Sequence, residues 1–334
     1  MTKNKLLLVD GNSVAFRAFF ALHNSLERFK NRNGLHTNAI YAFNTMFENV
    51  MQKEQPTHVL VAFDAGKTTF RTEMYAEYKG GRSKTPGEFK EQMPYIRDLL
   101  TGLGVQYYEL PNYEADDIIG TLAEKVDKDQ FDVVVLSGDR DLTQLASKEV
   151  KVDITVKGVS DIESYTPEHV AEKYDGLTPK QIIDMKGLAG DASDNIPGVT
   201  KIGEKTAIKL LKQYGSVEGI YEHIDEMKQS KMKENLINDK EQAFLSKKLA
   251  TINTSAPVDV SIDSLKYEGK NLDKLVPFYK EMDFNQFLSK LNIVEEVKMD
   301  DILFEVIHEF KEEMFTTDMA LYVEMMGDNY HTEE

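Results

Sequence analysis

The sequence predicts an α/β fold in which a mostly parallel sheet is flanked by helices and followed by a C-terminal helical region. Two observations lead to this prediction. Short apolar, β-branched runs alternate with segments of helical periodicity through the first half of the chain, which indicates βαβ units. Three of these runs also lead into an aspartate: Asp10, Asp64 and Asp139. Because the carboxyl ends of parallel strands open onto a ligand crevice, we expect these three aspartates to lie close together there.

Strands and helices are expected to alternate along residues 1–157. The apolar runs predict strands at 5–9, 58–63, 105–110, 132–137 and 150–156. Apolar residues that recur every three or four positions predict helices at 13–28, 38–53, 88–102, 114–126 and 141–147. This order predicts a sheet whose connecting helices cover both of its faces.

From about residue 166 the pattern becomes helical. Thr166-Pro167 and Thr178-Pro179 each combine an N-cap residue with proline at the first helical position, and Gln181 completes a capping box with Thr178. Glycines divide the following residues into short helices. We therefore expect an α/β core at 1–165, a helical region at 166–291 and a further acidic segment at 292–334.

Charge is distributed unevenly along the 334 residues, whose formal net charge is −17. Residues 295–334 hold thirteen acids and two bases, a net −11, which leaves −6 for residues 1–294. Residues 67–90, by contrast, carry six Lys or Arg against three acids. Because a polyanion responds to the local field, the acidic total does not exclude a nucleic-acid partner.

Cysteine is absent, which excludes disulfides, thiolate metal sites and cysteine nucleophiles. The N-terminal apolar run is four residues long, Leu6 to Val9, too short for a signal sequence or a membrane span. Seven histidines are scattered singly, and we assign none to a metal. We expect a cytoplasmic protein without a membrane partner.

Acidic residues at the strand ends predict a metal centre. Converging carboxylates either take up protons or hold cations, and oxygen-only ligation suits Mg²⁺ or Mn²⁺. Two such ions close together suit phosphodiester hydrolysis. For any single acid, capping of a helix is the simpler interpretation. For the whole set we favour metal binding by nine residues: Asp10, Asp64, Glu114, Asp116, Asp117, Asp139, Asp141, Asp191 and Asp194.

Residues 196–207 have the pattern of a helix-hairpin-helix, which we place within about 187–212. Gly198 and Gly203 would let the backbone approach a phosphate, and Lys201 and Lys205 would add charge beside the N-terminus of the second helix. Such contacts bind the phosphate backbone rather than a base sequence. The alternative is an ordinary glycine-capped helical turn.

The segment at about 67–92 interleaves bases with aromatics and follows a strand that carries a candidate metal ligand. Such a segment can grip phosphates and stack on unpaired nucleotides. A solvated surface loop is the alternative, but its position favours an active-site lid. Its candidate DNA contacts are Arg71, Tyr78, Lys79, Arg82 and Lys84.

These motifs together resemble the 5′-nuclease, or flap endonuclease, family, and most of all its bacterial members that form the 5′→3′ exonuclease region of a DNA polymerase. The resemblance covers roughly residues 4–291. It rests on the segments 8–13 with Arg17, 34–39, 62–64, 78–82, 114–117, 137–141 and 190–198.

The resemblance implies a PIN-like nuclease core, a helical arch over the site and a helix-three-turn-helix that binds duplex DNA. It implies that Lys79 and Arg82 contact the scissile phosphate and that Arg17 contacts DNA. It further implies a K⁺ ion held by Ser193 and by hairpin carbonyls. The expected partners are branched or nicked duplexes with a 5′ flap and RNA–DNA primer junctions, bound by a nucleoid-associated monomer.

Residues 292–334 resemble an acidic linker and the opening of the next polymerase domain, which is related to proofreading exonucleases. An active proofreader would show Asp-x-Glu on its first strand, whereas this chain has Leu321-Tyr322-Val323-Glu324-Met325. Whether the chain is a fragment of a polymerase or a standalone nuclease stays open.

We therefore expect a structure-specific 5′ nuclease that uses two Mg²⁺ or Mn²⁺ ions to remove 5′ flaps and RNA primers. We assign Asp10, Asp64, Glu114, Asp116 and Asp139 to the first ion, and Asp117, Asp141, Asp191 and Asp194 to the second. A haloacid-dehalogenase-type phosphatase would need Asp-x-Asp after the first strand, where this chain has Asp10-Gly11-Asn12. A flap-binding scaffold without activity would have lost some of the acids.

Overall fold

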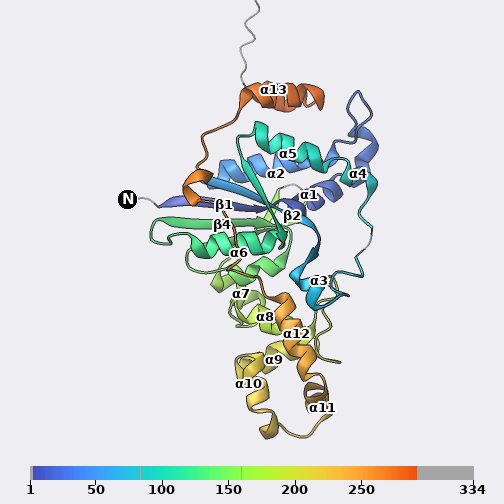
Figure 1. Cartoon of the computed structure of the whole chain (residues 1–334), viewed down its shortest axis with the longest axis vertical. Helices are drawn as coiled ribbons and strands as arrows, with labels where there is room; N and C mark the ends of the chain where they lie inside the picture. Colours follow the sequence, from blue (N-terminus) through green and yellow to red (C-terminus); the bar gives the residue numbers. More distant parts are fainter. Residues whose placement is uncertain (1–2, 83, 159, 292–334) are drawn as a thin grey trace, which may run out of the picture. The chain divides into compact units, whose positions relative to one another are not determined.

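The structure, a computed structural model, describes residues 3–82, 84–158 and 160–291. Within these residues six strands form one sheet in the order β3-β2-β1-β4-β5-β6, with β6 antiparallel to β5 and the other neighbours parallel (Figure 1). The strands are β1 Asn4–Asp10, β2 His58–Thr69, β3 Gln106–Asn112, β4 Phe131–Ser137, β5 Val150–Lys157 and β6 Asp161–Tyr165. The expected fold class, a mostly parallel sheet flanked by helices, is confirmed.

Both faces of the central strands are buried because each face has its own layer of helices. Along β1, Leu7 and Val9 join one apolar cluster and Leu6 and Leu8 join the other. The first cluster contains helices α1 Gly11–Ala21, α2 Asn38–Glu54 and α5 Met93–Gly102. The second contains α6 Ala115–Lys125, which lies on the opposite side of the sheet in Figure 1. Because helices cover both faces of the sheet, the central strands consist of continuous apolar residues rather than alternating polar and apolar ones.

Short helices follow the sheet, and the first two of them begin with the caps that the sequence predicts. Thr166 accepts a hydrogen bond from the His169 N–H at the start of α7, and Thr178 and Gln181 form the reciprocal pair of a capping box. The helices of this region are α7 Pro167–Lys173, α8 Gln181–Ala189, α9 Glu204–Tyr214, α10 Val217–Glu222, α11 Lys231–Asn238 and α12 Lys240–Ala250.

The chain then returns to the sheet. Helices α13 Leu272–Glu281 and α14 Asn285–Lys290 add Leu275, Phe278 and Phe287 to the same apolar cluster as α2 and α5. The domain bounds expected from the sequence remain a proposal. Within the expected range 166–291, however, helices α13 and α14 pack on the α/β core rather than on the helical region.

Several elements differ from the sequence prediction in their extent. The predicted helix 88–102 is divided into α4 Gly87–Lys90 and α5, because Pro94 lies in the first turn of α5. The predicted helix 141–147 is a 3₁₀ helix, Arg140–Leu145, and the end of the predicted helix 13–28 is another, His23–Arg28. The antiparallel edge strand β6 was not predicted.

The edge of the sheet where the parallel strands end is the place that matters for function. Asp10 is the last residue of β1, and Asp139 follows β4 by two residues. Strand β2 continues past Asp64 and leads into α3 Phe70–Met74. Between α3 and α4, the described residues of the expected arch form turns and extended chain rather than a helix.

In the part of the chain that the structure describes, none of the helices combines the length and the apolar character needed to cross a membrane. The expected acidic linker and proofreading-like segment, 292–334, lies outside the described residues.

Candidate active site

Asp10 is the most constrained of the strand-end carboxylates. Its side chain accepts a hydrogen bond from the Ser13 N–H at 3.0 Å, which caps α1, and a second from the Ser137 hydroxyl at 2.8 Å. Ser137 in turn accepts the Asp139 N–H at 2.9 Å, so one hydroxyl joins the ends of β1 and β4. Burial, followed by the charge of Asp64, raises the pKa of Asp10 to about 6.

The neighbouring carboxylates are held by the start of α6. Asp64 accepts a hydrogen bond from the Ala115 N–H at 2.8 Å, and its own N–H donates to Asn12 at 2.9 Å. Asp116, in the first turn of α6, has its pKa raised well above the ordinary value by burial and by the charges of Asp10 and Asp139. These mutual effects place the four carboxylates Asp10, Asp64, Asp116 and Asp139 in one electrostatic cluster.

Asp141 and Asp191 extend this cluster towards the helical region. Lys186 of α8 forms ion pairs with both carboxylates, at 2.5 Å from Asp191. Burial and the charge of Asp139 nevertheless raise the pKa of Asp141 to about 7, because Lys186 offsets only part of their effect. Lys186 therefore links the loop that carries Asp191 to the segment after β4, which carries Asp141.

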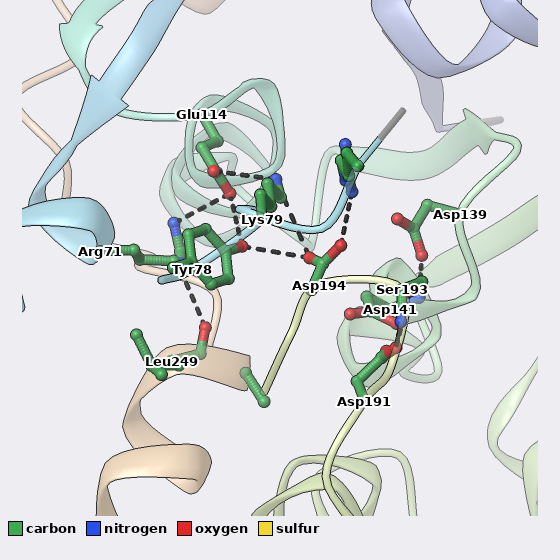
Figure 2. A network of polar contacts seen from close by, with 12 residues as sticks. Arg71, Tyr78, Lys79, Glu114, Asp139, Asp141, Asp191, Ser193, Asp194 and Leu249 are labelled. Carbon is green, nitrogen blue, oxygen red and sulfur yellow. Dashed lines mark hydrogen bonds and ion pairs between the residues drawn. The ribbon is translucent and has the colours of Figure 1, made fainter. Parts of the chain in front are cut away.

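Glu114 and Asp194 meet at the arch (Figure 2). Tyr78 donates its hydroxyl to both carboxylates at 3.2 Å, and Lys79 lies 2.8 Å from Glu114 and 3.9 Å from Asp194. Arg82 forms a 2.5 Å ion pair with Asp194. The Lys79 N–H also donates to the Asp194 carbonyl at 2.8 Å, so the arch backbone docks on the same loop. Two arch cations thus lie beside the carboxylates.

Asp117 is different from the other eight acids. It is fully buried, and its two oxygens accept hydrogen bonds from both Arg71 nitrogens at 2.8 Å, from the Asn253 N–H at 2.8 Å and from the Glu114 N–H at 3.0 Å. It caps α6 together with Glu114. These bonds occupy both carboxylate oxygens of Asp117, an arrangement that favours the capping alternative over the expected metal ligand.

Oxygen donors alone make up the remaining set, and the raised pKa values of Asp10, Asp116 and Asp141 mark negative charge that the protein does not fully compensate. Both properties fit hard divalent cations. Within the described residues, no three acidic or histidine side chains are already arranged around one ion position. Instead Lys79, Arg82 and Lys186 form ion pairs with Glu114, Asp141, Asp191 and Asp194.

The predicted hairpin lies between α8 and α9. Gly203 is the N-cap residue of α9 and faces open space, and Lys201 and Lys205 are exposed beside it. Gly198, the other glycine expected to approach a phosphate, has different surroundings. It is buried with φ +62°, and a Cβ there would lie 2.2 Å from the Gly190 nitrogen, so it is needed for packing of the loop.

Some of the other residues expected to contact DNA or K⁺ lie on the surface, and others lie in the interior. Lys84 is exposed, whereas Arg17 is half-buried and donates to the Thr155 carbonyl at 3.1 Å. Arg71 and Tyr78, also expected to contact DNA, are 2% and 5% exposed and bonded to acids, so neither lies on the surface of this structure. Ser193, the expected K⁺ ligand, donates its hydroxyl to Asp191 at 2.6 Å.

Sequence reasoning missed residues that hold the site together. Lys186 bridges two candidate metal ligands. The signal in the sequence was its position in a helix, five residues before Asp191. Ser137 orients Asp10 from the end of β4. Gln242 and Ser246 of α12 bond the carbonyl and the N–H of Gly198, at 2.5 and 2.9 Å. Nothing local in the sequence marks these two residues.

A strand-end carboxylate cluster with arch cations and a helical hairpin beside it defines a nuclease of the kind that acts on nucleic-acid ends. Comparison with known families agrees. Residues 5–175 match the 5′-3′ exonuclease N-terminal resolvase-like domain, and residues 177–273 match the 5′-3′ exonuclease C-terminal SAM fold. The chain belongs to the 5′-3′ exonuclease family, and the expected family and exonuclease function are confirmed.

The similar curated proteins are bacterial DNA polymerases I. The chain is 56% identical over 333 residues to that of Streptococcus pneumoniae (strain ATCC BAA-255 / R6), covering 100% of this chain and 38% of the relative. It is 53% identical over 336 residues to that of Bacillus subtilis (strain 168), covering 99% and 38%. The chain thus spans about 38% of the length of these relatives.

Two groups of solved structures share the fold. The T5 D15 protein co-crystallised with metal ions aligns with a TM-score of 0.64 and 22% identity, over 84% of this chain and 99% of that one. The catalytic core of Rad2 in complex with DNA substrate aligns with a TM-score of 0.55 and 16% identity, over 86% and 93%. At these identities the likeness concerns the fold.

Proposed function

We propose that this chain hydrolyses phosphodiester bonds at the 5′ ends of branched or nicked duplex DNA, and that it does so with divalent metal ions. The observation that carries the proposal is the meeting of Asp10, Asp64, Asp116 and Asp139 at one edge of the sheet, beside the arch cation Lys79. A carboxylate cluster next to a cation suits a phosphate that must be bound and then attacked.

We propose two Mg²⁺ or Mn²⁺ ions as the cofactors. Asp10, Asp64, Glu114, Asp116 and Asp139 would hold the first ion, and Asp141, Asp191 and Asp194 the second. When bound, the ions would lower the pKa of a water and neutralise charge on the leaving oxygen. The T5 D15 protein, which shares the fold, was crystallised with metal ions, and this supports the proposal.

Two arch residues would act on the scissile phosphate. In the structure Lys79 and Arg82 are ion-paired with Glu114 and Asp194, so their cationic groups already lie at the carboxylates. A cation at this place is worth most when negative charge develops on the phosphate during reaction. We therefore assign them a catalytic role rather than a role in general affinity.

The hairpin would hold the duplex away from the carboxylates. The first turn of α9 offers free N–H groups and the positive end of the helix dipole, and Lys201 and Lys205 add charge beside it. A T5 D15 pseudo-enzyme-product complex with DNA and the Rad2 complexes with DNA substrate share this fold. A K⁺ ion held by Ser193 and hairpin carbonyls is part of the same proposal.

The biological substrates would be 5′ flaps and RNA primers on the bacterial chromosome. The polymerase relatives, 38% of whose length this chain matches, support a nuclease that trims primers for a polymerase, and we propose that it acts as a monomer. No observation on the described residues favours a phosphatase: Asn12 stands where the second aspartate would be, and it accepts the Asp64 N–H.

The experiment compares a 5′-labelled flap duplex with the same duplex carrying a 3′ flap, both at low protein concentration and with excess Mg²⁺. We expect cleavage of the 5′ flap near its branch point and little cleavage of the 3′ flap. Equal cleavage of both substrates, or of neither, would contradict a structure-specific 5′ nuclease.

A further inference from the structure

Arg71, in the short helix α3, lies in the interior, where its guanidinium contacts two separate segments, at Glu114 and at Leu249 (Figure 2). Both terminal nitrogens bond Asp117 at 2.8 Å, and one of them lies 3.3 Å from Glu114. The Nε atom donates to the Leu249 carbonyl at 2.9 Å, and Nη2 donates to the Thr251 carbonyl at 2.8 Å. Every nitrogen of the side chain thus has a protein partner.

Asp117 completes this arrangement from the other side. Besides Arg71, its oxygens accept the Glu114 N–H and the Asn253 N–H. Burial alone would lower the pKa of Arg71, but the hydrogen bonds and charge of Asp117 outweigh it and raise that pKa, so the guanidinium stays charged. A buried carboxylate and a buried guanidinium, each fully bonded, form one rigid unit.

This unit connects the two halves of the proposed active site. Leu249 belongs to the last turn of α12, whose carbonyls have no partner within the helix, and Arg71 bonds the Leu249 carbonyl. The same helix supports the hairpin through Gln242 and Ser246. On the other side, the unit holds the first turn of α6, beside Glu114. The hairpin and the carboxylate helix are therefore joined through one ion pair.

We propose that Arg71 and Asp117 form a positioning clamp, which sets Glu114 and the 249–253 segment relative to one another and touches neither DNA nor metal. The Arg71–Asp117 clamp fixes the distance between the place where duplex is held and the place where it is cut. The inference rests on the proposed nuclease function only for its activity measurement. Because the guanidinium fork bonds several partners in one plane, lysine cannot replace it.

The test uses three single variants, Arg71→Lys, Asp117→Asn and Asp116→Asn. Arg97→Lys, in the half-exposed pair with Glu109 on the same core, serves as the matched control. For Arg71→Lys and Asp117→Asn we expect the melting temperature in EDTA to fall by roughly 5–10 °C, because each leaves a buried polar partner unsatisfied. Arg97→Lys should change it by no more than about 2 °C.

The activity measurement distinguishes a positioning role from direct contact with DNA or with a metal ion. Arg71→Lys should lower the single-turnover rate about tenfold while the Kd for flap DNA in Ca²⁺ changes less than about twofold. Asp117→Asn should keep its Mg²⁺-induced rise in melting temperature, which Asp116→Asn should lose in large part. A changed DNA Kd and salt slope for Arg71→Lys, or disappearance of the Mg²⁺-induced rise in Asp117→Asn, would overturn the clamp.

A double-mutant cycle keeps the inference testable if a single variant is too unstable to assay. In Arg71→Gln/Asp117→Asn the two amides can bond each other, so the melting temperature should fall by clearly less than the sum of the decreases measured for the single variants Arg71→Gln and Asp117→Asn. Additive decreases would contradict the pairing. If the wild-type protein does not cleave the flap, the proposed function fails, while the thermal cycle and the Mg²⁺-induced shift still decide the clamp.

Discussion

At the scale of single residues, Asp116 and Asp117 have opposite surroundings although they are consecutive in the chain. Asp117 is bonded to Arg71 and to two backbone N–H groups, whereas Asp116 lies among other acids that raise its pKa. The pattern Glu-Ala-Asp-Asp predicted that acids gather at the start of α6, and that is correct. It could not distinguish the two aspartates, because the partner Arg71 is distant in sequence and becomes a neighbour only through the fold.

For Asp116→Asn we expect the metal-free protein to become more stable while activity falls by at least about a hundredfold. The charged carboxylate is buried beside Asp10 and Asp139, so a neutral amide relieves repulsion and raises the melting temperature in EDTA by roughly 2–5 °C. Thermal unfolding and single-turnover cleavage measure the two effects. Asp98→Asn, a change outside the carboxylate cluster, is the control, and a destabilised Asp116→Asn would show that this acid has a structural role.

For Lys79→Ala we expect the single-turnover rate to fall by about 10²–10³, while the Kd for flap DNA changes only a few-fold. The reason is that Lys79 lies 2.8 Å from Glu114, at the carboxylates rather than on the open surface. Exposed Lys84→Ala is the control from the same segment and should weaken binding without slowing chemistry. An intact rate with a weaker Kd for Lys79→Ala would place the residue in binding alone.

At the scale of elements, the sequence predicts best where the periodicity is long and local. Strands β1, β3, β4 and β5 and helices α2 and α6 were predicted within a few residues of their bounds, because their apolar patterns are regular, whereas β2 runs on to Thr69 beyond its predicted end at 63. The edge strand β6 was missed because it is short and only partly buried. The support of the hairpin by Gln242 and Ser246 could not be predicted, since it depends on how α12 packs against the loop at Gly198.

For Lys201→Ala and Lys205→Ala we expect weaker binding to duplex DNA and a shallower salt dependence, by about one unit for each phosphate that is no longer neutralised. Both lysines are exposed at the start of α9, where phosphate would meet the free N–H groups. Fluorescence anisotropy in Ca²⁺ at several salt concentrations measures the slope. Lys212→Ala, at the far end of α9 and paired with Asp175, is the control and should change the slope less.

At the scale of the whole described unit, segments from both ends of the described chain together form the apolar core on one face of the sheet. Strand β1 is the first strand in the sequence and lies in the middle of the sheet, and α13, which follows the helical region in the sequence, packs on α5 and α2. Sequence patterns predicted helices here, but not their return to the sheet, because long-range packing leaves no local signal. The nuclease core therefore needs the segment after the helical region in order to bury its own apolar face.

For Leu275→Ala we expect the free energy of unfolding to fall by about 2–5 kcal/mol, because the side chain is fully buried against α5. Leu272→Ala, on the same helix but 45% exposed, is the matched control and should change it by no more than about 0.5 kcal/mol. Urea unfolding of the two variants provides the comparison. Equal decreases would show that α13 is not part of the core.

The central claim is that the carboxylate cluster cuts 5′ flaps by means of divalent ions, and single-turnover cleavage of a labelled flap duplex tests it most directly. The rate should rise with Mg²⁺ until it saturates, Mn²⁺ should replace Mg²⁺, and excess EDTA should abolish cleavage. Asp139→Ala should lose orders of magnitude in rate while it still retards the flap in a gel. Cleavage that persists in excess EDTA, or a near-normal rate for Asp139→Ala, would contradict the account.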